Sequence, residues 1–501
     1  RSPEELGHRL LQLCQHPTVA AADHTQTDPA PFHALHATMA ELYPILHERL
    51  EVERVGELGI GLLFRWAGSD ESLAREPLVL MAHQDVVPVD GQDWSVDPFE
   101  GALTDGESAR EGGEGVPPSA GGASASPAGH SSAGGARDIY GRASAGTSSA
   151  EGARNQRGDL RVVARGTLDD KGSMLTILEG VETLLAEGFE PKRDTYLFFG
   201  DCEEVAGATA KQVAALLQER GLKPWMVLDE GGAVAEAGVL PGVERAAAMI
   251  AVAEKGIVDV RLTATDPGGH ASTPARGGAT ARIARAILEL EKHPFKAHLP
   301  APTRRMLGEL GRHAPFAARL LYANVGPLEP LVARVLATLG PETGAMARTT
   351  VAVTQLSGSP AANVLATTAT ATLNVRVAVG VPVAQAISWI RRIIDDDSVD
   401  VHVVAATQPS RVSPVEGEQW DLLAALVDEV FPDAVAAPYV QNGATDSRRF
   451  SPWVDNVYRF APLRMDREER ARLHAADESI SAATLAEGVR FVSRLIEEAC
   501  G

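Results

Sequence analysis

Pro77-Leu-Val-Leu-Met-Ala82 runs directly into His83-Gln84-Asp85, so an almost wholly apolar segment ends in polar side chains. A short apolar run of this kind is typical of a strand that is buried on both faces, as in a parallel sheet. The segments Asp194–Phe199 and Pro224–Leu228 have the same character. Acidic side chains follow each of them within a few residues, which predicts a polar site at the carboxyl ends of these strands.

Helix-like segments alternate with these strands. Apolar residues in Met174–Leu185 recur at the spacing of a helix, and the pattern stops at Gly188. A second helix is expected between Glu204 and Gly221, and a final helix near Leu485–Ile496. The alternation predicts an α/β domain with a mostly parallel sheet and helices on both of its faces.

From about Val252 the pattern of the chain changes. Strand and helix patterns follow in the order β-α-β-β-α-β, which predicts a smaller α+β domain of ferredoxin-like type inserted in the first. We therefore assign residues 1–251 and 406–501 to the α/β domain and residues 252–405 to the inserted domain, with a helical excursion over about 299–347. The expected strands are Ile257–Leu262, Thr350–Leu356, Thr368–Val377 and Val399–Ala405, and the expected helices are Ala281–Glu291 and Val383–Ile394.

Residues 105–159 differ in composition from the rest of the chain. Between Glu111 and Leu160, Gly, Ala and Ser make up 30 of 50 residues. Such a segment cannot bury enough apolar surface to offset the entropy lost on ordering it, so we expect a long, mobile surface insertion. A linker between two domains is the alternative. The insertion is favoured because the strand before it and the acidic motif after it serve one site.

The composition excludes several classes of protein. The chain of 501 residues has 46 Lys and Arg against 67 Asp and Glu, a net charge of −21, which argues against a nucleic-acid partner. Its three cysteines form no CxxC pair, which argues against a thiolate zinc site and favours a reducing, cytoplasmic compartment. No apolar run approaches the ~18 residues that span a bilayer, and no basic-then-apolar leader opens the chain, so no membrane association is expected.

Four clusters of acidic or histidine residues lie where strands end or helices begin. Like charges cannot gather in a crevice unless their pKa values rise or a cation neutralises them, so a bound divalent metal is the simplest explanation. Carboxylates and imidazoles without thiolates suit Zn²⁺ or a similar first-row ion. The four clusters are His83-Gln84-Asp85, Leu168-Asp169-Asp170-Lys171-Gly172, Glu203-Glu204 and Asp229-Glu230-Gly231-Gly232.

Two of these clusters indicate particular roles. His83 and Asp85 point the same way on an extended strand end, so Asp85 could accept the second ring N–H of a metal-binding His83. A structural hydrogen bond without metal is the alternative for this pair. The side chains of Glu203 and Glu204 diverge, so one can bind metal while the other acts as a general base. On its own, such a pair is more often a solvated helix surface.

Several motifs occur in a fixed order along the chain: His83-Gln-Asp85-Val-Val-Pro88, Arg165-Gly-Thr-Leu-Asp169-Asp-Lys171-Gly172, Glu203-Glu204-Val-Ala-Gly207, Asp229-Glu-Gly-Gly232, Val252-Ala-Glu254-Lys255-Gly256, Gly268-Gly-His270-Ala-Ser, Asn442-Gly-Ala-Thr445-Asp446-Ser447-Arg448 and Leu473-His474. Jointly they resemble the co-catalytic zinc peptidases of the aminoacylase, acetylornithine deacetylase and carboxypeptidase family. The resemblance is greatest to the carboxypeptidase S and N-acyl-amino-acid hydrolase branch. It covers the chain from about His83 to the C-terminus, without the insertion. Cys202 is a departure, because many relatives have Asp before the glutamate pair.

The resemblance implies a site with two Zn²⁺ ions, for which Co²⁺ or Mn²⁺ could substitute. Glu203 would act as the general base, and Asp85 would orient His83. Without the resemblance, His474 would be interpreted as a surface histidine. The implied metal ligands are His83 and Asp229 on one ion, Glu204 and His474 on the other, and Asp169 on both.

The resemblance also implies substrate-binding residues in and near the inserted domain. Asn363 and Arg376 resemble the family's substrate-binding pair, with Arg376 holding a substrate carboxylate, and Gly443 is a third position of this kind. An ordinary strand arginine that faces solvent is the alternative for Arg376. His270 would stabilise the oxyanion, in relatives often from the partner subunit, so a homodimer through the inserted domain is expected. A bland loop histidine is the alternative for His270.

We therefore expect hydrolysis of an amide bond in a small substrate with a free carboxylate, such as a peptide C-terminus, a dipeptide or an N-acyl amino acid. A metal-activated water would attack, with Glu203 as general base. A metal-dependent phosphoesterase and a catalytically silent binding protein of the same fold are the alternatives. The sequence has no Gly-x-Ser-x-Gly, HExxH or Walker motif that would support another class of hydrolase.

Overall fold

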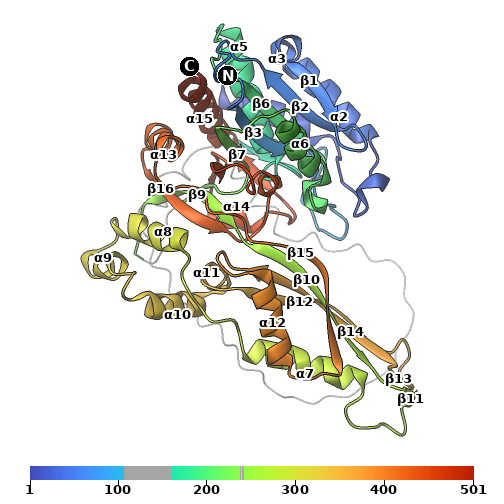
Figure 1. Cartoon of the computed structure of the whole chain (residues 1–501). Coiled ribbons are helices and arrows are strands. Elements are labelled where there is room, and N and C mark those ends of the chain that lie inside the picture. The colour runs from blue at the N-terminus through green and yellow to red at the C-terminus, as the bar shows by residue number, and fades with distance from the viewer. Residues whose placement is uncertain (106–159, 237, 240–241) are drawn as a thin grey trace.

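The computed structural model describes residues 1–105, 160–236, 238–239 and 242–501 (Figure 1). The predicted Gly/Ala/Ser-rich insertion lies, apart from Asp105, outside the described residues. Both of its flanks belong to one small sheet, because β4 (Ala102–Asp105) and β5 (Leu160–Val163) pair antiparallel and β19 (Ser479–Ser481) pairs with β5. The chain therefore leaves and re-enters the same part of the fold at this point.

A large mixed sheet forms the centre of the α/β part. Its middle strands are parallel, since β3 (Leu78–His83) pairs in parallel with both β6 (Thr195–Gly200) and β7 (Met226–Asp229). The strand β17 continues the parallel pairing beside β7, whereas β2 pairs antiparallel with β6. The order is β1-β2-β6-β3-β7-β17-β9-β8-β18, with β16 beside β9. The remaining strands are β1 (Glu51–Val55), β2 (Gly61–Trp66), β8 (Val234–Ala235), β9 (Ala246–Glu254), β16 (Ala434–Gln441), β17 (Val457–Arg459) and β18 (Arg464–Met465).

Helices cover both faces of this sheet, as predicted. One face packs against α1 (Pro3–Cys14), α5 (Lys171–Ala186), α13 (Glu418–Val430) and α15 (Ala482–Cys500), whose buried side chains form the largest apolar cluster. The other face packs against α6 (Ala208–Glu219). The shorter helices α2 (Ala30–Leu42) and α3 (Pro44–Arg49) add Leu35, Met39 and Leu46 to the large cluster. Among the described residues, no helix combines the length and the hydropathy that crossing a bilayer requires.

The inserted part is a four-stranded antiparallel sheet with two helices packed on it. Its order β12-β14-β10-β15 is that of a ferredoxin-like fold, so the predicted fold class is confirmed. Buried and more exposed positions alternate along β14, which explains the one-sided strand pattern in the sequence. The elements are β10 (Gly256–Thr265), β12 (Thr350–Ser357), β14 (Thr368–Val377), β15 (Val399–Thr407), α7 (Ala279–Lys292) and α12 (Val383–Ile394).

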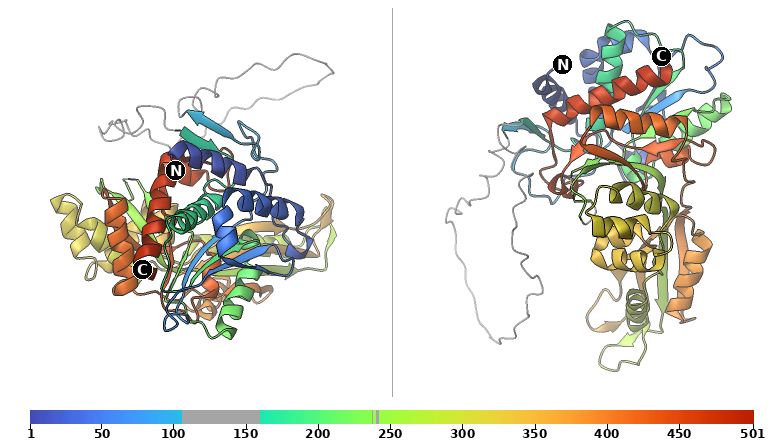
Figure 2. Two further views of the ribbon diagram at one scale, coloured as in Figure 1. Left: turned by 90° about the horizontal axis from the view of Figure 1, so that it is seen from above. Right: turned by 90° about the vertical axis from the view of Figure 1, so that its left-hand side faces the viewer.

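A group of helices lies between α7 and β12 in sequence and beside β16 in space (Figures 1 and 2). Its apolar side chains, including Met306 and Leu307, form a separate cluster with Ala247, Met249 and Ala437 of the central sheet. The predicted helical excursion therefore packs against the α/β part. The helices are α8 (Ala301–Gly311), α9 (Phe316–Ala323), α10 (Glu329–Leu339) and α11 (Pro341–Met346).

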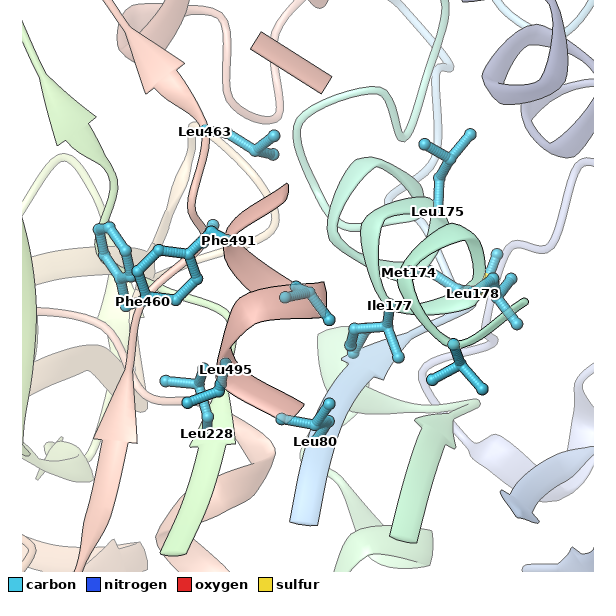
Figure 3. Packing of buried hydrophobic residues seen from close by; sticks show 14 of the residues in the cluster. Leu80, Met174, Leu175, Ile177, Leu178, Leu228, Phe460, Leu463, Phe491 and Leu495 are labelled. Carbon is cyan, nitrogen blue, oxygen red and sulfur yellow. The ribbon is translucent and has the colours of Figure 1, made fainter. Parts of the chain in front are cut away.

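The C-terminal helix α15 is held by aromatic packing in the main core. Phe460 and Phe491 meet edge to face with ring centroids 5.3 Å apart, and Leu228 and Leu495 lie beside them (Figure 3). All four are buried. Burial of such rings contributes both apolar area and ring–ring contact.

We expect the substitution Phe491→Ala to lower the free energy of unfolding by about 3–5 kcal/mol, because it removes a buried ring and leaves a cavity under α15. Val52→Ala is a suitable control, since Val52 is 48% exposed on β1, and its effect should stay within about 0.5 kcal/mol. Denaturant titration followed by circular dichroism measures both. Equal effects for the two variants would contradict this account of the core.

Candidate metal centre

The carboxyl end of β3 supplies the first two polar residues of the centre. His83 is buried, and its Nε2 lies 2.8 Å from Asp169 Oδ1. Its other ring nitrogen, Nδ1, lies 2.9 Å from the backbone carbonyl oxygen of Asp85 and 3.4 Å from Asp85 Oδ1. The ring is therefore held from behind, which leaves Nε2 directed at the centre.

Asp169 lies at the middle of the cluster, on the loop between β5 and α5. His83 contacts its Oδ1, and His474 Nε2 lies 2.9 Å from its Oδ2. His474 Nε2 also lies 3.2 Å from Glu204 Oε1. The two oxygens of one carboxylate thus face two different imidazoles, which is the arrangement that a bridging ligand requires.

Glu203 and Glu204 begin a 3₁₀ turn, η2 (Glu203–Val205), directly after β6. The carboxylate of Asp85 accepts the backbone N–H of Glu203 at 3.1 Å and that of Glu204 at 3.0 Å. Asp85 therefore connects the histidine strand to the glutamate turn. The chain leaves the turn through Gly207, which has φ +61°, and a Cβ there would collide with the carboxylate of Asp446.

Asp229 ends β7 beside this group. Its Oδ2 accepts the N–H of Ser447 at 2.8 Å, and its Oδ1 accepts the N–H of Glu230 at 2.9 Å. These bonds fix the carboxylate against the loop that follows β16, and its role as a metal ligand stays a prediction. The same loop is anchored by Thr445, whose N–H and hydroxyl both donate to Glu254 at 2.8 Å.

Glu478 is a buried residue that sequence reasoning missed. Its carboxylate accepts the backbone N–H groups of Gly166, Leu168 and Asp169 at 3.2, 2.7 and 3.1 Å, and it pairs with Arg165 at 2.6 Å. Glu478 therefore shapes the loop that presents Asp169. Arg165 opens the quoted motif, and a buried arginine requires an acidic partner, but only the structure shows that Arg165 is buried.

Negative charge accumulates at the centre. Burial raises the pKa values of Glu203 and Glu230 well above their usual range, and it raises the pKa of Asp446 to about 8. The hydrogen bond to Asp169 raises the pKa of His474 to about 10. These directions show more carboxylates than the two imidazoles can balance.

The donor set suits a divalent cation. Ligand atoms of His83, Asp169 and Glu204 all lie within 4.8 Å of one another. Glu204 Oε1 is buried, and its contact with His474 Nε2 at 3.2 Å is an ion pair without the geometry of a hydrogen bond. A buried carboxylate oxygen with this weak contact, facing imidazole and carboxylate donors, is what a bound first-row metal would satisfy.

The predicted residues of the inserted part are divided between its two ends. Arg376 on β14 pairs in register with Ile257 at the start of β10, close to the α/β part. His270 is paired with Val364, next to Asn363, at the far tip, where β11 (Gly269–His270) and β13 (Val364–Leu365) meet (Figure 1). Because the ten residues of β10 extend about 30 Å, the structure does not bring His270 and Asn363 to Arg376 within one chain.

The loop after β16 carries the remaining predicted position. Gly443 is exposed there, two residues before Thr445. Through Thr445 and Ser447 the loop is bonded to Glu254 and Asp229, so Gly443 lies at the border of the centre.

Comparison with known proteins identifies the class of enzyme. Residues 147–498 match Peptidase family M20/M25/M40, and the chain belongs to this family of metal-dependent peptidases. It is 32% identical over 441 residues to the human N-fatty-acyl-amino acid synthase/hydrolase PM20D1. The aligned region covers 87% of this chain and 76% of the relative. It is 30% identical over 499 residues to the "Probable carboxypeptidase S-like 2" of Dictyostelium discoideum, covering 98% and 85% of the two chains.

Solved structures confirm the fold. The M20 family metallo-carboxypeptidase Sso-CP2 from Sulfolobus solfataricus has a TM-score of 0.63 at 15% identity, covering 98% of both chains. Human carnosine dipeptidase 1 has a TM-score of 0.63 at 13% identity, covering 99% of this chain and 96% of its own. The resemblance inferred from the motifs is therefore confirmed, and the protein is a hydrolase of the metallopeptidase class.

We expect Glu478→Gln to lower the metal content and to destabilise the protein by about 3–5 kcal/mol, because it leaves Arg165 buried without its ionic partner. Metal analysis by mass spectrometry and thermal unfolding measure the two effects. Glu497→Gln is the control, since it removes a partly exposed ion pair with Arg494 that contributes less than about 1 kcal/mol. Metal content and melting temperature equal to those of the control would contradict the role of Glu478.

Proposed function

We propose that this enzyme hydrolyses the amide bond of a small substrate whose amine side carries a free carboxylate, with N-acyl amino acids as the first candidates. One observation carries the proposal: the carboxylate of Asp169 faces both His83 and His474, and the glutamate pair lies on the adjoining turn. This arrangement fits a hydrolytic centre better than a binding site, because it combines metal donors with a neighbouring free acid–base group.

The proposed centre holds two zinc ions. Asp169 would bind both, His83 and Asp229 would complete one ligand set, and Glu204 and His474 the other. When bound, zinc lowers the pKa of water and polarises a carbonyl group. The bonds described above hold these side chains in place: Ser447 orients Asp229, and Asp85 orients both His83 and the turn that carries Glu204.

Glu203 is the proposed general base. Burial raises the pKa of Glu203 well above its usual range, which makes its carboxylate a stronger base than that of an exposed glutamate. We infer that it takes a proton from the attacking water and passes it to the nitrogen of the leaving amine. Its backbone N–H is fixed by Asp85, which keeps the side chain next to the centre.

Arg376 is the proposed anchor of the substrate carboxylate. It is half-buried, and its Nε donates to Asn374 Oδ1 at 2.9 Å, which orients the guanidinium. Its two terminal nitrogens then remain for a bidentate contact with a carboxylate. Because His270 and Asn363 lie at the far tip of the inserted part, we propose that a second copy of the chain supplies them to the centre in a homodimer.

The names of two relatives suggest different classes of substrate. The name of the human relative specifies N-fatty-acyl amino acids, and that of the Dictyostelium relative specifies a carboxypeptidase. A peptidase that acts on dipeptides or peptide C-termini is therefore the second candidate. In both cases the same carboxylate anchor and the same glutamate pair would serve the reaction.

We expect Glu203→Gln to keep its metal and lose turnover by about 10²–10⁴-fold, because the amide cannot accept the proton. His474→Ala is the matched comparison and should lose metal as well as activity. Activity assays with elemental analysis of the same samples separate the two cases. Near-normal kcat in Glu203→Gln would show that another group is the base.

A panel of N-acyl amino acids, dipeptides and phosphate esters tests the substrate class.

We expect Arg376→Ala to lower kcat/KM by about 10–100-fold for substrates with a free carboxylate, as the loss of a charged hydrogen bond predicts. It should leave the same substrates as methyl esters unaffected. Arg261→Ala, an exposed arginine on β10, serves as the control. Turnover of phosphate esters alone would contradict the proposed function.

A further inference from the structure

We propose a separate divalent-cation site formed by His24, Asp201 and Cys202, behind the turn that carries the glutamate pair. It shares no ligand with the metal centre described above. Its donor set differs as well, since it would include a thiolate, which the main centre lacks. The proposal does not depend on the reaction that the enzyme catalyses.

The three residues come from two parts of the chain. Asp201 and Cys202 directly follow β6, and His24 begins the short 3₁₀ turn η1 (His24–Gln26) in the N-terminal region. Ligand atoms of the three side chains all lie within 4.8 Å of one another, and His24 Nε2 is 3.3 Å from Asp201 Oδ2. No CxxC pair in the sequence indicates this group, because it consists of one cysteine, one histidine and one carboxylate.

The polar atoms of the group are buried and poorly satisfied. The side chain of Asp201 is fully buried, and among the described residues its oxygens make no hydrogen bond of good geometry; its charged neighbour is His24, whose Nε2 lies 3.3 Å from Oδ2. His24 Nε2 is buried and makes none either. A buried carboxylate in this state is destabilising unless a cation neutralises it.

Gly56 and Thr209 pack closely around the group. A Cβ on Gly56 would lie 3.4 Å from Asp201 Oδ2 and 2.6 Å from Thr209 Oγ1, so no larger residue fits beside the carboxylate. Cys202 Sγ lies 3.6 Å from Thr209 Oγ1, which brings a hydroxyl oxygen to the same place. A threonine hydroxyl or a water molecule could then complete four ligands.

The donor types select the cation. One imidazole, one carboxylate and one thiol suit Zn²⁺ or Co²⁺ rather than Mg²⁺ or Ca²⁺. Donors on one tetrahedral zinc lie about 3.3–3.8 Å apart, so the observed spacing would close by side-chain rotation of about 1 Å. On binding, the sulfur–metal bond forms as the Cys202 thiol releases its proton to solvent.

A cation at this place would act on the neighbouring turn. Cys202 is followed directly by Glu203 and Glu204, and it occupies the N-cap position of η2 without a side-chain capping bond. Binding would tie the end of β6 to the N-terminal segment around His24. The ion would therefore position the turn rather than take part in the reaction.

Cobalt spectroscopy of the full chain provides the test. A thiolate bound to Co²⁺ gives an intense near-ultraviolet charge-transfer band, whereas imidazole and carboxylate ligands give only weak visible bands. The chain has three cysteines, and Cys14 and Cys500 lie outside the group. We expect the band in the cobalt-loaded wild type, its loss in Cys202→Ser, and its retention in Cys14→Ser and Cys500→Ser.

His24→Gln gives a second, independent variant, which should weaken or remove the same band while the three cysteines stay in place. The competing explanation is a buried ion pair between a protonated His24 and Asp201, with no metal. A wild-type protein that shows the weak visible bands of a loaded main centre but no charge-transfer band would overturn the proposal. A band that persists in Cys202→Ser would overturn it as well.

Discussion

Parallel pairing of β3 with β6 and β7 is the constraint on which the metal centre depends. It sends the carboxyl ends of three neighbouring strands to one edge, so that His83, the turn at Glu203 and Asp229 have to meet there. The loop of Asp169 brings one more carboxylate to the same edge. Such a concentration of negative charge is unfavourable in a buried crevice without a cation. The strand order that gathers these carboxylates therefore also creates the need for a metal.

Buried carboxylates outside the proposed set of metal ligands shape the loops around the centre. Asp85 accepts two backbone N–H groups of the glutamate turn, and Glu478 accepts three from the loop of Asp169. Glu254 does the same for Thr445 and pairs with the buried Arg459. Each loop is thus held by a second carboxylate, which leaves the side chains of the candidate ligands free to face inward.

The sequence was sufficient for features that depend on local pattern. Alternation and apolar runs predicted β14 and α12 with the bounds that the structure shows, because burial on one face imposes a period on the side chains. Long-range partners could not be predicted in this way. Glu478 lies more than 300 residues from the loop it organises, and nothing in its neighbours indicates that Arg165 is its partner.

The separation of Arg376 from His270 shows the same limit for the site. Arg376 lies on a strand that was predicted with its bounds, whereas no strand was predicted at His270, and the sequence alone does not reveal that the two residues occupy opposite ends of the inserted part. The family resemblance assigns both residues to substrate binding and catalysis at one site. Only the register of β10 with β14 shows that Arg376 lies at the start of β10, far from His270.

Contacts at the junction between the α/β part and the inserted part indicate how His270 reaches the metal centre. Lys255 lies between β9 and β10, is buried, and donates through Nζ to the carbonyl oxygens of Ala345 and Arg348. These bonds tie the start of β10 to the helices α8–α11, which themselves pack on the central sheet. Bending one chain far enough to bring His270 to Asp169 would break them and expose a buried ammonium group. A second copy that presents its own tip to the centre requires no such change, and we therefore favour the dimer over closure within one chain.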